Sequence, residues 1–327
     1  MKIVSIEEHF LTPEIIAAWD ASTIGSEGTA VFEQGKIGER IKDLGEGRLA
    51  LMDESGIDVQ VLSLTTPALH NLEPEESVGL AQETNNLVAA TIAKHPTRFQ
   101  GFAVLPMAAP QEAARELERC VKQLGFCGSM LCGRTRDKNL DHPDFLPLVE
   151  TAAELRVPLF IHPQIPQASV REALYSGFNE RVDMSFATFG IGWHYEAGIQ
   201  FVRLILSGTF DRFPHLQVIL GHWGEVVLFY LERLKSLARV TKLERPIEDY
   251  FKQNLYVTPS GMWSHDYLHR AITAVGPERI LFSSDYPYQY RPGGEGRAFL
   301  EQSSLSSQDQ ELFAHGNWER LMQSVVR

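Results

Sequence analysis

The segment Lys2-Ile-Val-Ser-Ile-Glu-Glu-His-Phe10 opens with an apolar run, and two potential metal ligands, Glu7 and His9, stand at its end. In a β-strand, side chains at positions i and i+2 project from the same face, so Glu7 and His9 can contact one ion together. Further candidate ligands or proton carriers stand at the ends of three later strand-like runs: His162, His222 and Asp285. Apolar runs that end in chemically active residues predict strands whose ends meet at one site.

Runs of the same kind recur along the chain, spaced widely enough to hold a helix between them. We expect strands at Lys2–Ile6, Val59–Leu64, Phe99–Leu105, Gly128–Leu131, Pro158–Ile161, Gln217–Leu220, Leu255–Thr258 and Ile280–Phe282. We expect helices at Glu76–Lys94, Pro110–Leu124, Pro147–Leu155, Glu196–Thr209, Val226–Val240 and His265–Ala274. Alternating strands and helices imply parallel pairing, and eight units in 327 residues predict an α/β fold, a (β/α)8 TIM barrel. Without a break in composition, residues 1–327 are expected to form a single domain.

A doubly wound open sheet is the competing architecture, but the chain lacks its nucleotide-binding fingerprint. The glycine cluster Gly293-Gly294-Glu295-Gly296 follows a proline rather than a strand, so we interpret it as a loop. The polar, glycine-containing stretch Ala21–Glu46 is interpreted as a long first strand-to-helix loop. In a barrel, such loops lie over the mouth of the active site.

The composition narrows the possible partners and the cellular compartment. A formal net charge of −12 and the lack of a basic block argue against nucleic acid and anionic membranes. The N-terminal segment lacks the features of a signal peptide, and no run of about 18 apolar residues could span a bilayer, so we expect a cytoplasmic protein. Cys120, Cys127 and Cys132 are odd in number and lack CxxC spacing, which predicts reduced thiols rather than disulfides or a cysteine zinc site.

The candidate ligands stand where barrel enzymes carry out their chemistry, at the carboxyl ends of the strands. His162 closes the fifth expected strand, His222 follows the sixth and Asp285 follows the eighth. Any one of these histidines taken alone would more often be a buried hydrogen-bonding residue, but their joint position favours a shared site. Two carboxylates with two or three imidazoles suit one divalent metal ion, Mn²⁺ or Zn²⁺.

Glu225 lies three residues after His222 in a glycine-rich turn, where its carboxylate could orient the imidazole and raise its basicity. It could also be an acid at the start of a helix, favoured by the helix dipole, and the two roles are compatible. Arg233 would fall on the helix after the sixth strand, where an arginine is ordinarily a solvated residue. His194 opens the helix before that strand and could line the pocket.

Other polar and aromatic residues allow two interpretations of their role each. Arg134 and Arg136 either meet a second anionic group on a ligand or form a solvated basic loop. Aromatic walls of a pocket could come from Tyr286, Tyr288, Trp193 and Trp223, although core packing explains each of them equally well. We assign surface or capping roles to six further histidines: His70, His95, His142, His215, His265 and His269.

Four motifs together resemble the amidohydrolase superfamily: Glu7-x-His9, Phe160-Ile-His162-Pro, Leu220-Gly-His222-Trp-Gly-Glu225 and Phe282-Ser-Ser-Asp285-Tyr-Pro. The resemblance spans nearly the whole chain and is to the branch of metal-dependent aromatic acid decarboxylases that includes the γ-resorcylate, 2,3-dihydroxybenzoate and 5-carboxyvanillate enzymes. Hydrolytic members typically carry His-x-His at the first motif, whereas Glu-x-His resembles the hydroxybenzoate decarboxylases.

The resemblance implies a role for each motif residue. Glu7, His9, His162 and Asp285 match the ligands of one divalent metal ion, and His222 with Glu225 matches a proton-transfer network. Arg233 and Arg48 match substrate-binding arginines, and Tyr288 is expected to contact the substrate. The implied reaction is the non-oxidative decarboxylation of a small ortho-hydroxy aromatic carboxylic acid, in which Asp285 protonates the ring before CO2 leaves. Relatives of this kind suggest a homodimer or homotetramer.

Two other functions remain open from the sequence. A metal-dependent hydrolase or hydratase on the same scaffold would use a metal-bound water against a lactone, an amide or an unsaturated acid. A non-catalytic barrel that only binds a metal or ligand is the third alternative, although such a protein has no need of a proton donor beside its metal.

Overall fold

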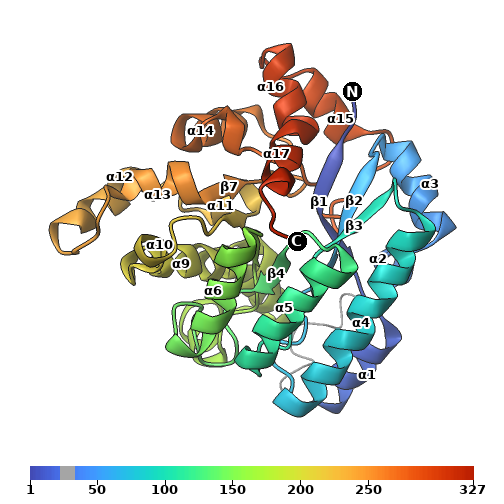
Figure 1. Cartoon of the computed structure of the whole chain (residues 1–327), viewed down its shortest axis with the longest axis horizontal. Coiled ribbons are helices and arrows are strands. Elements are labelled where there is room, and N and C mark those ends of the chain that lie inside the picture. The colour runs from blue at the N-terminus through green and yellow to red at the C-terminus, as the bar shows by residue number, and fades with distance from the viewer. Residues whose placement is uncertain (23–33) are drawn as a thin grey trace.

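The computed structural model describes residues 1–22 and 34–327 (Figure 1). Parallel strands form its centre, and helices surround them. The strands are β1 (Val4–Phe10), β2 (Val59–Leu64), β3 (Phe99–Gly101), β4 (Ser129–Cys132), β5 (Leu159–His162), β6 (Val218–Leu220) and β7 (Leu255–Val257). They pair in the order β1-β2-β3 and β4-β5-β6-β7.

Backbone hydrogen bonds also connect these two sheets at both edges. A parallel bridge between Ala103 and Ser129 joins the chain after β3 to β4. On the other side, the expected eighth strand forms a bridge from Ile280 to Val257 of β7, and Phe282 O accepts a hydrogen bond from Ile6 N of β1 at 3.0 Å. All eight expected segments are therefore linked in a ring, as the predicted (β/α)8 barrel requires.

Three strands differ from the sequence-based expectation by more than one residue at an end. β1 extends to Phe10, so Glu7 and His9 lie inside the strand rather than beyond it. β3 ends at Gly101 instead of Leu105; Phe102 and Ala103 still donate backbone hydrogen bonds to Leu62 and Gly128, and at Val104 the backbone pairs with the side chain of Asn85 rather than with a neighbouring strand. The eighth expected segment forms isolated backbone bridges instead of a regular strand. Asp285, just beyond this segment, has a φ of 56°, which an extended strand cannot contain.

The described part of the first connection contains three helices: α1 (Pro13–Ala21), α2 (Gly35–Lys42) and α3 (Glu46–Ser55). The prediction of one long loop over Ala21–Glu46 is therefore wrong for the part that α2 occupies, and residues 23–33 of it lie outside the described residues.

The remaining helices follow the strands around the barrel. They are α4 (Pro74–Lys94), α5 (Pro110–Leu124), η2 (Pro143–Phe145), α6 (Leu146–Leu155), α7 (Ala168–Leu174), α8 (Glu180–Ser185), η3 (Phe186–Gly190), α9 (Gly192–Leu206), α10 (Thr209–Arg212), α11 (His222–Glu225), α12 (Leu231–Leu234), η4 (Lys235–Arg239), α13 (Ile247–Asn254), α14 (His265–Val275), η5 (Pro277–Arg279), α15 (Glu295–Glu301), α16 (Ser307–Glu311), η6 (Leu312–Gly316) and α17 (Asn317–Gln323).

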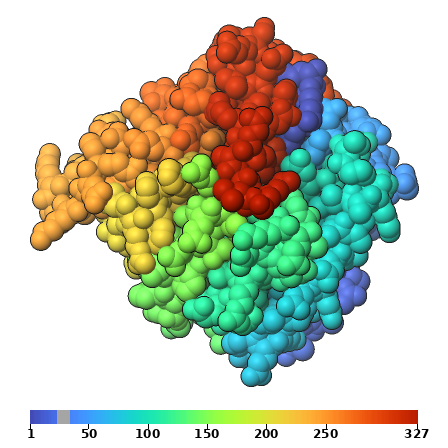
Figure 2. Space-filling view, viewed as in Figure 1, coloured from blue at the N-terminus to red at the C-terminus, as the bar shows by residue number. Residues whose placement is uncertain are grey.

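In place of the expected helix Val226–Val240 there are only α12 and η4, because Glu225 and Val226 adopt a left-handed backbone that a helix cannot continue. Figure 2 shows the segment after α12 projecting from the side of the molecule.

The helices form because apolar residues recur on one face between defined ends. In α5, Pro110 occupies the first turn, Leu117 and Val121 face the core, and Gly125 ends the helix in the left-handed conformation that glycine tolerates best. No helix in residues 1–22 and 34–327 is long and apolar enough to cross a bilayer.

The barrel has its own apolar filling, separate from the layer between strands and helices. Alternate strand residues such as Val4, Ile6, Phe160 and Ile219 meet inside it, and Trp318 of α17 packs against them. Strict alternation would place Glu8 next on the inner face after Ile6. The register of β1 against β2 shifts between Ser5 and Glu8, however, and this irregularity allows Glu7 and His9 to face the cluster described next.

Candidate metal and proton-transfer site

Four predicted ligands meet at the carboxyl ends of the strands. Glu7 and His9 come from β1, His162 ends β5, and Asp285 follows the eighth segment. All four are buried, and one potential ligand atom from each lies within 4.8 Å of the others. The structure thus brings together residues separated by up to 278 positions in the chain, since Asp285 and Glu7 differ by that number.

The contacts inside this cluster are close but do not saturate its polar atoms. His9 Nε2 lies 3.3 Å from Asp285 Oδ1, and His162 Nε2 lies 3.7 Å from Glu7 Oε1. The His9 and His162 rings are 4.8 Å apart between centroids, edge to face. Glu7 Oε1 and His9 Nε2 are buried and make no hydrogen bond to any described residue.

Neighbouring groups fix the orientation of the ligands. His162 Nδ1 lies 2.8 Å from Pro163 O, a contact in which Nδ1 carries the proton and Nε2 is left to face the cluster. Glu7 Oε2 accepts hydrogen bonds from three hydroxyl groups, those of Ser260, Ser283 and Thr258. Gly221 is required beside them, since an added Cβ would stand 2.6 Å from Ser260 Oγ.

The electrostatics of the cluster favour a cation. Burial raises the pKa of Glu7 to about 7, and burial together with the charge of Glu7 raises the pKa of Asp285 well above its usual range. Burial also lowers the pKa of His9 to about 3 and that of His162 well below its usual value. Neutral imidazoles are the metal-binding form, and a divalent ion would supply the positive charge that the two carboxylates lack. Together with the unpaired Glu7 Oε1 and His9 Nε2, these properties fit a metal site.

A second group lies beside the cluster and is organised around Glu225. One oxygen of its buried carboxylate is 2.7 Å from His222 Nδ1, and the other is 2.7 Å from His194 Nδ1. Nδ1 of His222 faces Glu225. The His222 ring also borders the metal-ligand cluster, because its centroid lies 6.3 Å from that of the His162 ring. The predicted pairing of His222 with Glu225 is present in the structure, and His194 shares the same carboxylate.

This arrangement keeps His222 protonated at neutral pH. Burial alone would lower its pKa, but the Glu225 carboxylate overcomes that effect and raises the pKa of His222 to about 10. Burial alone would raise the pKa of Glu225, but His222 and His194 hold it at about 2. The backbone at His222, Trp223 and Glu225 has φ values of 46°, 56° and 49°, a conformation that costs free energy and is often found at functional sites.

Two predicted substrate-contact residues lie close to the cluster. The Tyr288 ring is 5.4 Å from that of His9, and its hydroxyl shares a 2.6 Å hydrogen bond with Thr65. Arg48 is fully buried; Nη1 donates to His9 O at 2.9 Å and Nε donates to Gln60 Oε1 at 2.7 Å. Its Nη2 makes no hydrogen bond to any described residue.

The other predicted arginines lie elsewhere. Arg233 is exposed on α12, whereas the four cluster residues are buried. Arg134 is buried in an ion pair with Glu196, at 3.2 Å, so the solvated-loop interpretation is wrong for it. Arg136 pairs with Glu73 at 2.8 Å at the surface.

One of the histidine predictions is also wrong. His70 is buried rather than at the surface or in a cap, because its Nε2 accepts the Cys132 N–H at 3.0 Å at the end of β4. The prediction of a capping role is confirmed for His142, whose side chain accepts the Asp144 N–H. The cysteine prediction is confirmed as well, since Cys120, Cys127 and Cys132 are free, buried thiols.

Several residues around the cluster were not predicted. Ser260 and Thr258 hold Glu7, and a signal was available, because both hydroxyl residues fall at the end of an apolar run in the same way as the ligands do. Glu8 is fully buried between two ligands, and a charged residue inside a buried strand is a signal of the same kind.

A parallel barrel with buried carboxylates and imidazoles at the carboxyl ends of its strands defines a metal-dependent barrel enzyme as the class of protein. Comparison with known families agrees: the family described as Amidohydrolase matches residues 9–322. The chain belongs to the amidohydrolase family.

Individual relatives match over almost their whole length. The γ-resorcylate decarboxylase of Polaromonas sp. (strain JS666 / ATCC BAA-500) is 35% identical over 332 residues, covering 97% of this chain and 97% of that protein. The crystal structure of 5-carboxyvanillate decarboxylase from Novosphingobium aromaticivorans DSM 12444, complexed with manganese and 4-hydroxy-3-methoxy-5-nitrobenzoic acid, has a TM-score of 0.90 and 29% identity, covering 98% of this chain and 96% of that one. A structure of 2,6-dihydroxybenzoate decarboxylase complexed with 2,6-dihydroxybenzoate has a TM-score of 0.87 and 29% identity, covering 99% of each chain.

Proposed function

We propose that this protein is a metal-dependent, non-oxidative decarboxylase of an ortho-hydroxy aromatic carboxylic acid. The observation that carries the proposal is the buried cluster of Glu7, His9, His162 and Asp285, beside which His222 is held by the Glu225 carboxylate. The relatives named as decarboxylases of 2,6-dihydroxybenzoate, γ-resorcylate and 5-carboxyvanillate support this substrate class, because each of their names denotes an aromatic carboxylic acid.

The four cluster residues would hold one divalent ion, and Mn²⁺ is favoured over Zn²⁺ because a related structure contains manganese. When bound, such an ion supplies Lewis acidity toward the carboxylate and the adjacent phenolic oxygen of the substrate. The residues present fit this ion, since they offer two neutral imidazoles and two carboxylates.

The chain itself would move the protons. Asp285 would transfer a proton from its carboxyl oxygen to the ring carbon that bears the substrate carboxylate. As the bond between that carbon and the carboxylate breaks, its electron pair returns to the ring, aromaticity is restored and CO2 leaves. His222, oriented by Glu225, would donate a hydrogen bond to the phenolic oxygen from Nε2, the ring nitrogen not used in the contact with Glu225, and so polarise that oxygen.

Three residues are proposed as substrate contacts. Arg48 is supported by its buried Nη2, which makes no hydrogen bond to a described residue, and Tyr288 by its position beside His9. Arg233 rests on the sequence resemblance alone, because it lies exposed on α12.

A homodimer or homotetramer is proposed as the assembled state. Large apolar side chains are exposed near the projecting segment, with Phe229 75% and Val240 81% exposed, and such surfaces commonly become buried between subunits. We also propose that the chain is one domain and cytoplasmic, the latter supported by its three free, buried thiols. Sedimentation analysis of the purified protein would test the assembly.

The decisive experiment measures CO2 release by the Mn²⁺-loaded protein from a panel of 2-hydroxybenzoates. Benzoates without the ortho hydroxyl and simple lactones serve as controls. Release confined to the ortho-hydroxy acids is expected, because among these compounds only they can present a phenolic oxygen together with a carboxylate oxygen to one ion. Lactone opening or hydration of an unsaturated acid without CO2 release would instead assign a hydrolase or hydratase, and metal binding without turnover of any compound would assign a non-catalytic barrel.

A further inference from the structure

Three of the four cluster residues come from just two neighbouring segments. Glu7 and His9 belong to β1, and Asp285 belongs to the segment that follows Ile280. The alignment of these two segments therefore sets the relative positions of three candidate metal ligands. Small displacements matter at such a site, because a shift of about 1 Å can cost about 100-fold in activity.

Backbone hydrogen bonds join the two segments on either side of the Asp285 turn. Ile6 N donates to Phe282 O at 3.0 Å, and His9 N donates to Tyr286 O at 2.7 Å. Between these bonds β1 shifts its register, and the backbone of Asp285 is left-handed. Glu8 forms a parallel bridge with Tyr286, but no regular ladder continues through the interval, so side-chain contacts add to the backbone pairing there.

The side chain of Glu8 spans this interval. It is fully buried, and both of its oxygens accept hydrogen bonds from the opposite segment: Oε1 from Ser284 N at 3.0 Å, and Oε2 from Ser284 Oγ at 2.7 Å. Ser5 Oγ donates to Oε1, and Gln60 Nε2 donates to Oε2 at 3.0 Å. Glu8 thus binds the residue immediately before Asp285 while standing between Glu7 and His9.

The same hydrogen-bond chain returns to β1. Gln60 Oε1 accepts Arg48 Nε at 2.7 Å, and Arg48 Nη1 donates to His9 O at 2.9 Å. The Arg48 guanidinium also lies 4.5 Å above the centre of the Tyr286 ring. Residues on both sides of Asp285 are therefore connected to β1 through Glu8 and Arg48.

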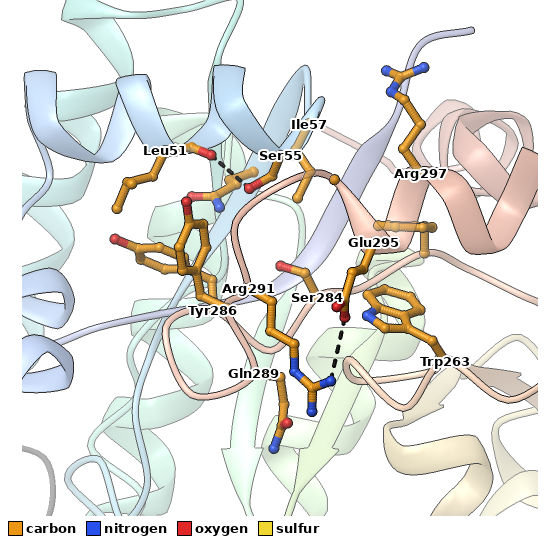
Figure 3. A pocket seen from close by; sticks show the side chains of 15 residues that line it. Leu51, Ser55, Ile57, Trp263, Ser284, Tyr286, Gln289, Arg291, Glu295 and Arg297 are labelled. Atoms are coloured by element: carbon orange, nitrogen blue, oxygen red, sulfur yellow. Dashed lines mark hydrogen bonds and ion pairs between the residues drawn. The ribbon is translucent and has the colours of Figure 1, made fainter.

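The hydrogen bonds between Glu8 and Ser284 lie on the face of the Asp285 segment opposite to the candidate ligands. Ser284 and Tyr286 line a cleft between α3 and the chain around α15 (Figure 3), whereas Ser283 and Asp285 face Glu7 and His9. Gln60 also lines this cleft. A substitution at Ser284 can therefore alter the support of Asp285 without adding or removing a group on the metal side.

We propose that Glu8 is a positioning residue that holds Asp285 in register with Glu7 and His9 for metal binding. The inference rests on the proposed metal site but not on the identity of the substrate. Residues that support metal ligands from behind typically contribute 10- to 100-fold in metal affinity or activity.

The test compares Mn²⁺ binding by Glu8→Gln, Ser284→Ala and Ser55→Ala with that of the wild-type protein, using titration calorimetry and the electron paramagnetic resonance spectrum of the bound ion. Glu8→Gln replaces one accepting oxygen by an NH2 group that cannot accept from Ser284 or Gln60. Ser284→Ala removes only the hydroxyl bond. Ser55→Ala is the matched control, because Ser55 lines the same cleft but its hydroxyl donates to Leu51 O within α3 (Figure 3).

We expect the dissociation constant for Mn²⁺ to rise about 10- to 100-fold in Glu8→Gln and by less in Ser284→Ala, with an altered spectrum at saturating metal and no change in Ser55→Ala. Wild-type affinity and spectrum in a folded Glu8→Gln protein would overturn the proposal; if that variant does not fold, wild-type values in Ser284→Ala would do so. A loss of Mn²⁺ affinity in Ser55→Ala as large as that in Glu8→Gln would also overturn the proposal. Because these measurements need no substrate, they remain decisive even if the protein releases no CO2 from any acid.

Discussion

Asp285 combines a buried carboxylate, a left-handed backbone and a contact of 3.3 Å with His9 Nε2. We predict that Asp285→Asn lowers the rate of CO2 release at least about 1,000-fold, because the amide cannot donate a carboxyl proton to the ring. Substrate binding, measured by calorimetry with Mn²⁺ present, should change far less, since an amide oxygen can still act as a ligand.

Asp53→Asn provides the control for that measurement, because Asp53 is a surface carboxylate paired with Arg98 at 2.7 Å. Turnover by Asp285→Asn at the wild-type rate would exclude the proposed proton donor. A loss of substrate binding as large as the loss of turnover would assign Asp285 to binding alone.

His70 provides a test of pH dependence away from the reacting groups. Burial lowers its folded-state pKa to about 3, compared with an unfolded value of about 6.5. Its contribution to stability is therefore fully present above pH 6.5 and is lost as the pH falls toward 3, because the unfolded state then binds a proton that the folded state rejects. Between pH 7.5 and 5.5, this one group should cost the wild-type protein about 1.4 kcal/mol of unfolding free energy.

The variant His70→Gln cannot bind that proton. We predict that it is less stable than the wild type at pH 7.5 and that the difference narrows by about 1.4 kcal/mol at pH 5.5, as measured by urea unfolding. A gap that stays constant with pH would mean that His70 titrates alike in both states.

At the scale of elements, Asn85 connects α4 to the chain beyond β3 and to α5. Its amide donates to Val104 O and to Glu116 Oε1, and its oxygen accepts Val104 N–H, with all three distances between 2.7 and 2.8 Å. We predict that Asn85→Ala lowers the unfolding free energy by about 2–4 kcal/mol, because it leaves three buried polar groups without these partners. The neighbouring Asn86→Ala, at an exposed position, should cost less than about 0.5 kcal/mol in the same urea titration.

At the scale of the whole molecule, the proposed ion would connect segments from opposite ends of the chain. Mn²⁺ at 100 times its dissociation constant should add about 2.7 kcal/mol to the unfolding free energy. For a chain of this size, that corresponds to a rise of roughly 5 °C in the midpoint of thermal unfolding, and chelation with EDTA should reverse it.

Glu7→Gln separates this effect from general salt effects, because it keeps the shape of the side chain but removes one charge from the cluster. The Mn²⁺-induced rise should be mostly lost in this variant. An equal rise in both proteins, or none in the wild type, would show that the ion does not bind at Glu7.

Much of the architecture was predictable because it depends on local patterns. Alternating apolar runs and amphipathic stretches predicted the parallel strands, α4, α5 and the class of fold, since burial of apolar side chains follows the strand and helix periods. The failures lie where a tertiary contact overrides the local pattern. Beyond the short β3, the backbone of Val104 forms hydrogen bonds with the side chain of Asn85 instead of extending the strand. The helix expected at Val226–Val240 does not form at its start, because the left-handed turn that contains His222 and Glu225 continues into Val226.

The sequence by itself predicted the barrel, the polar residues at its strand ends and the pairing of His222 with Glu225, because spacing and strand ends are local properties that the chain carries before it folds. The family resemblance then singled out four of those polar residues as candidate ligands. Only the tertiary structure placed His194 on the second oxygen of Glu225, buried His70 against β4 and connected Glu8 to Ser284. These contacts join residues 31 to 276 positions apart. The helix and strand periods in the sequence do not specify contacts over such separations. The hydrogen bonds between these buried polar groups are therefore set only when the barrel closes, because each buried polar group then needs a hydrogen-bond partner.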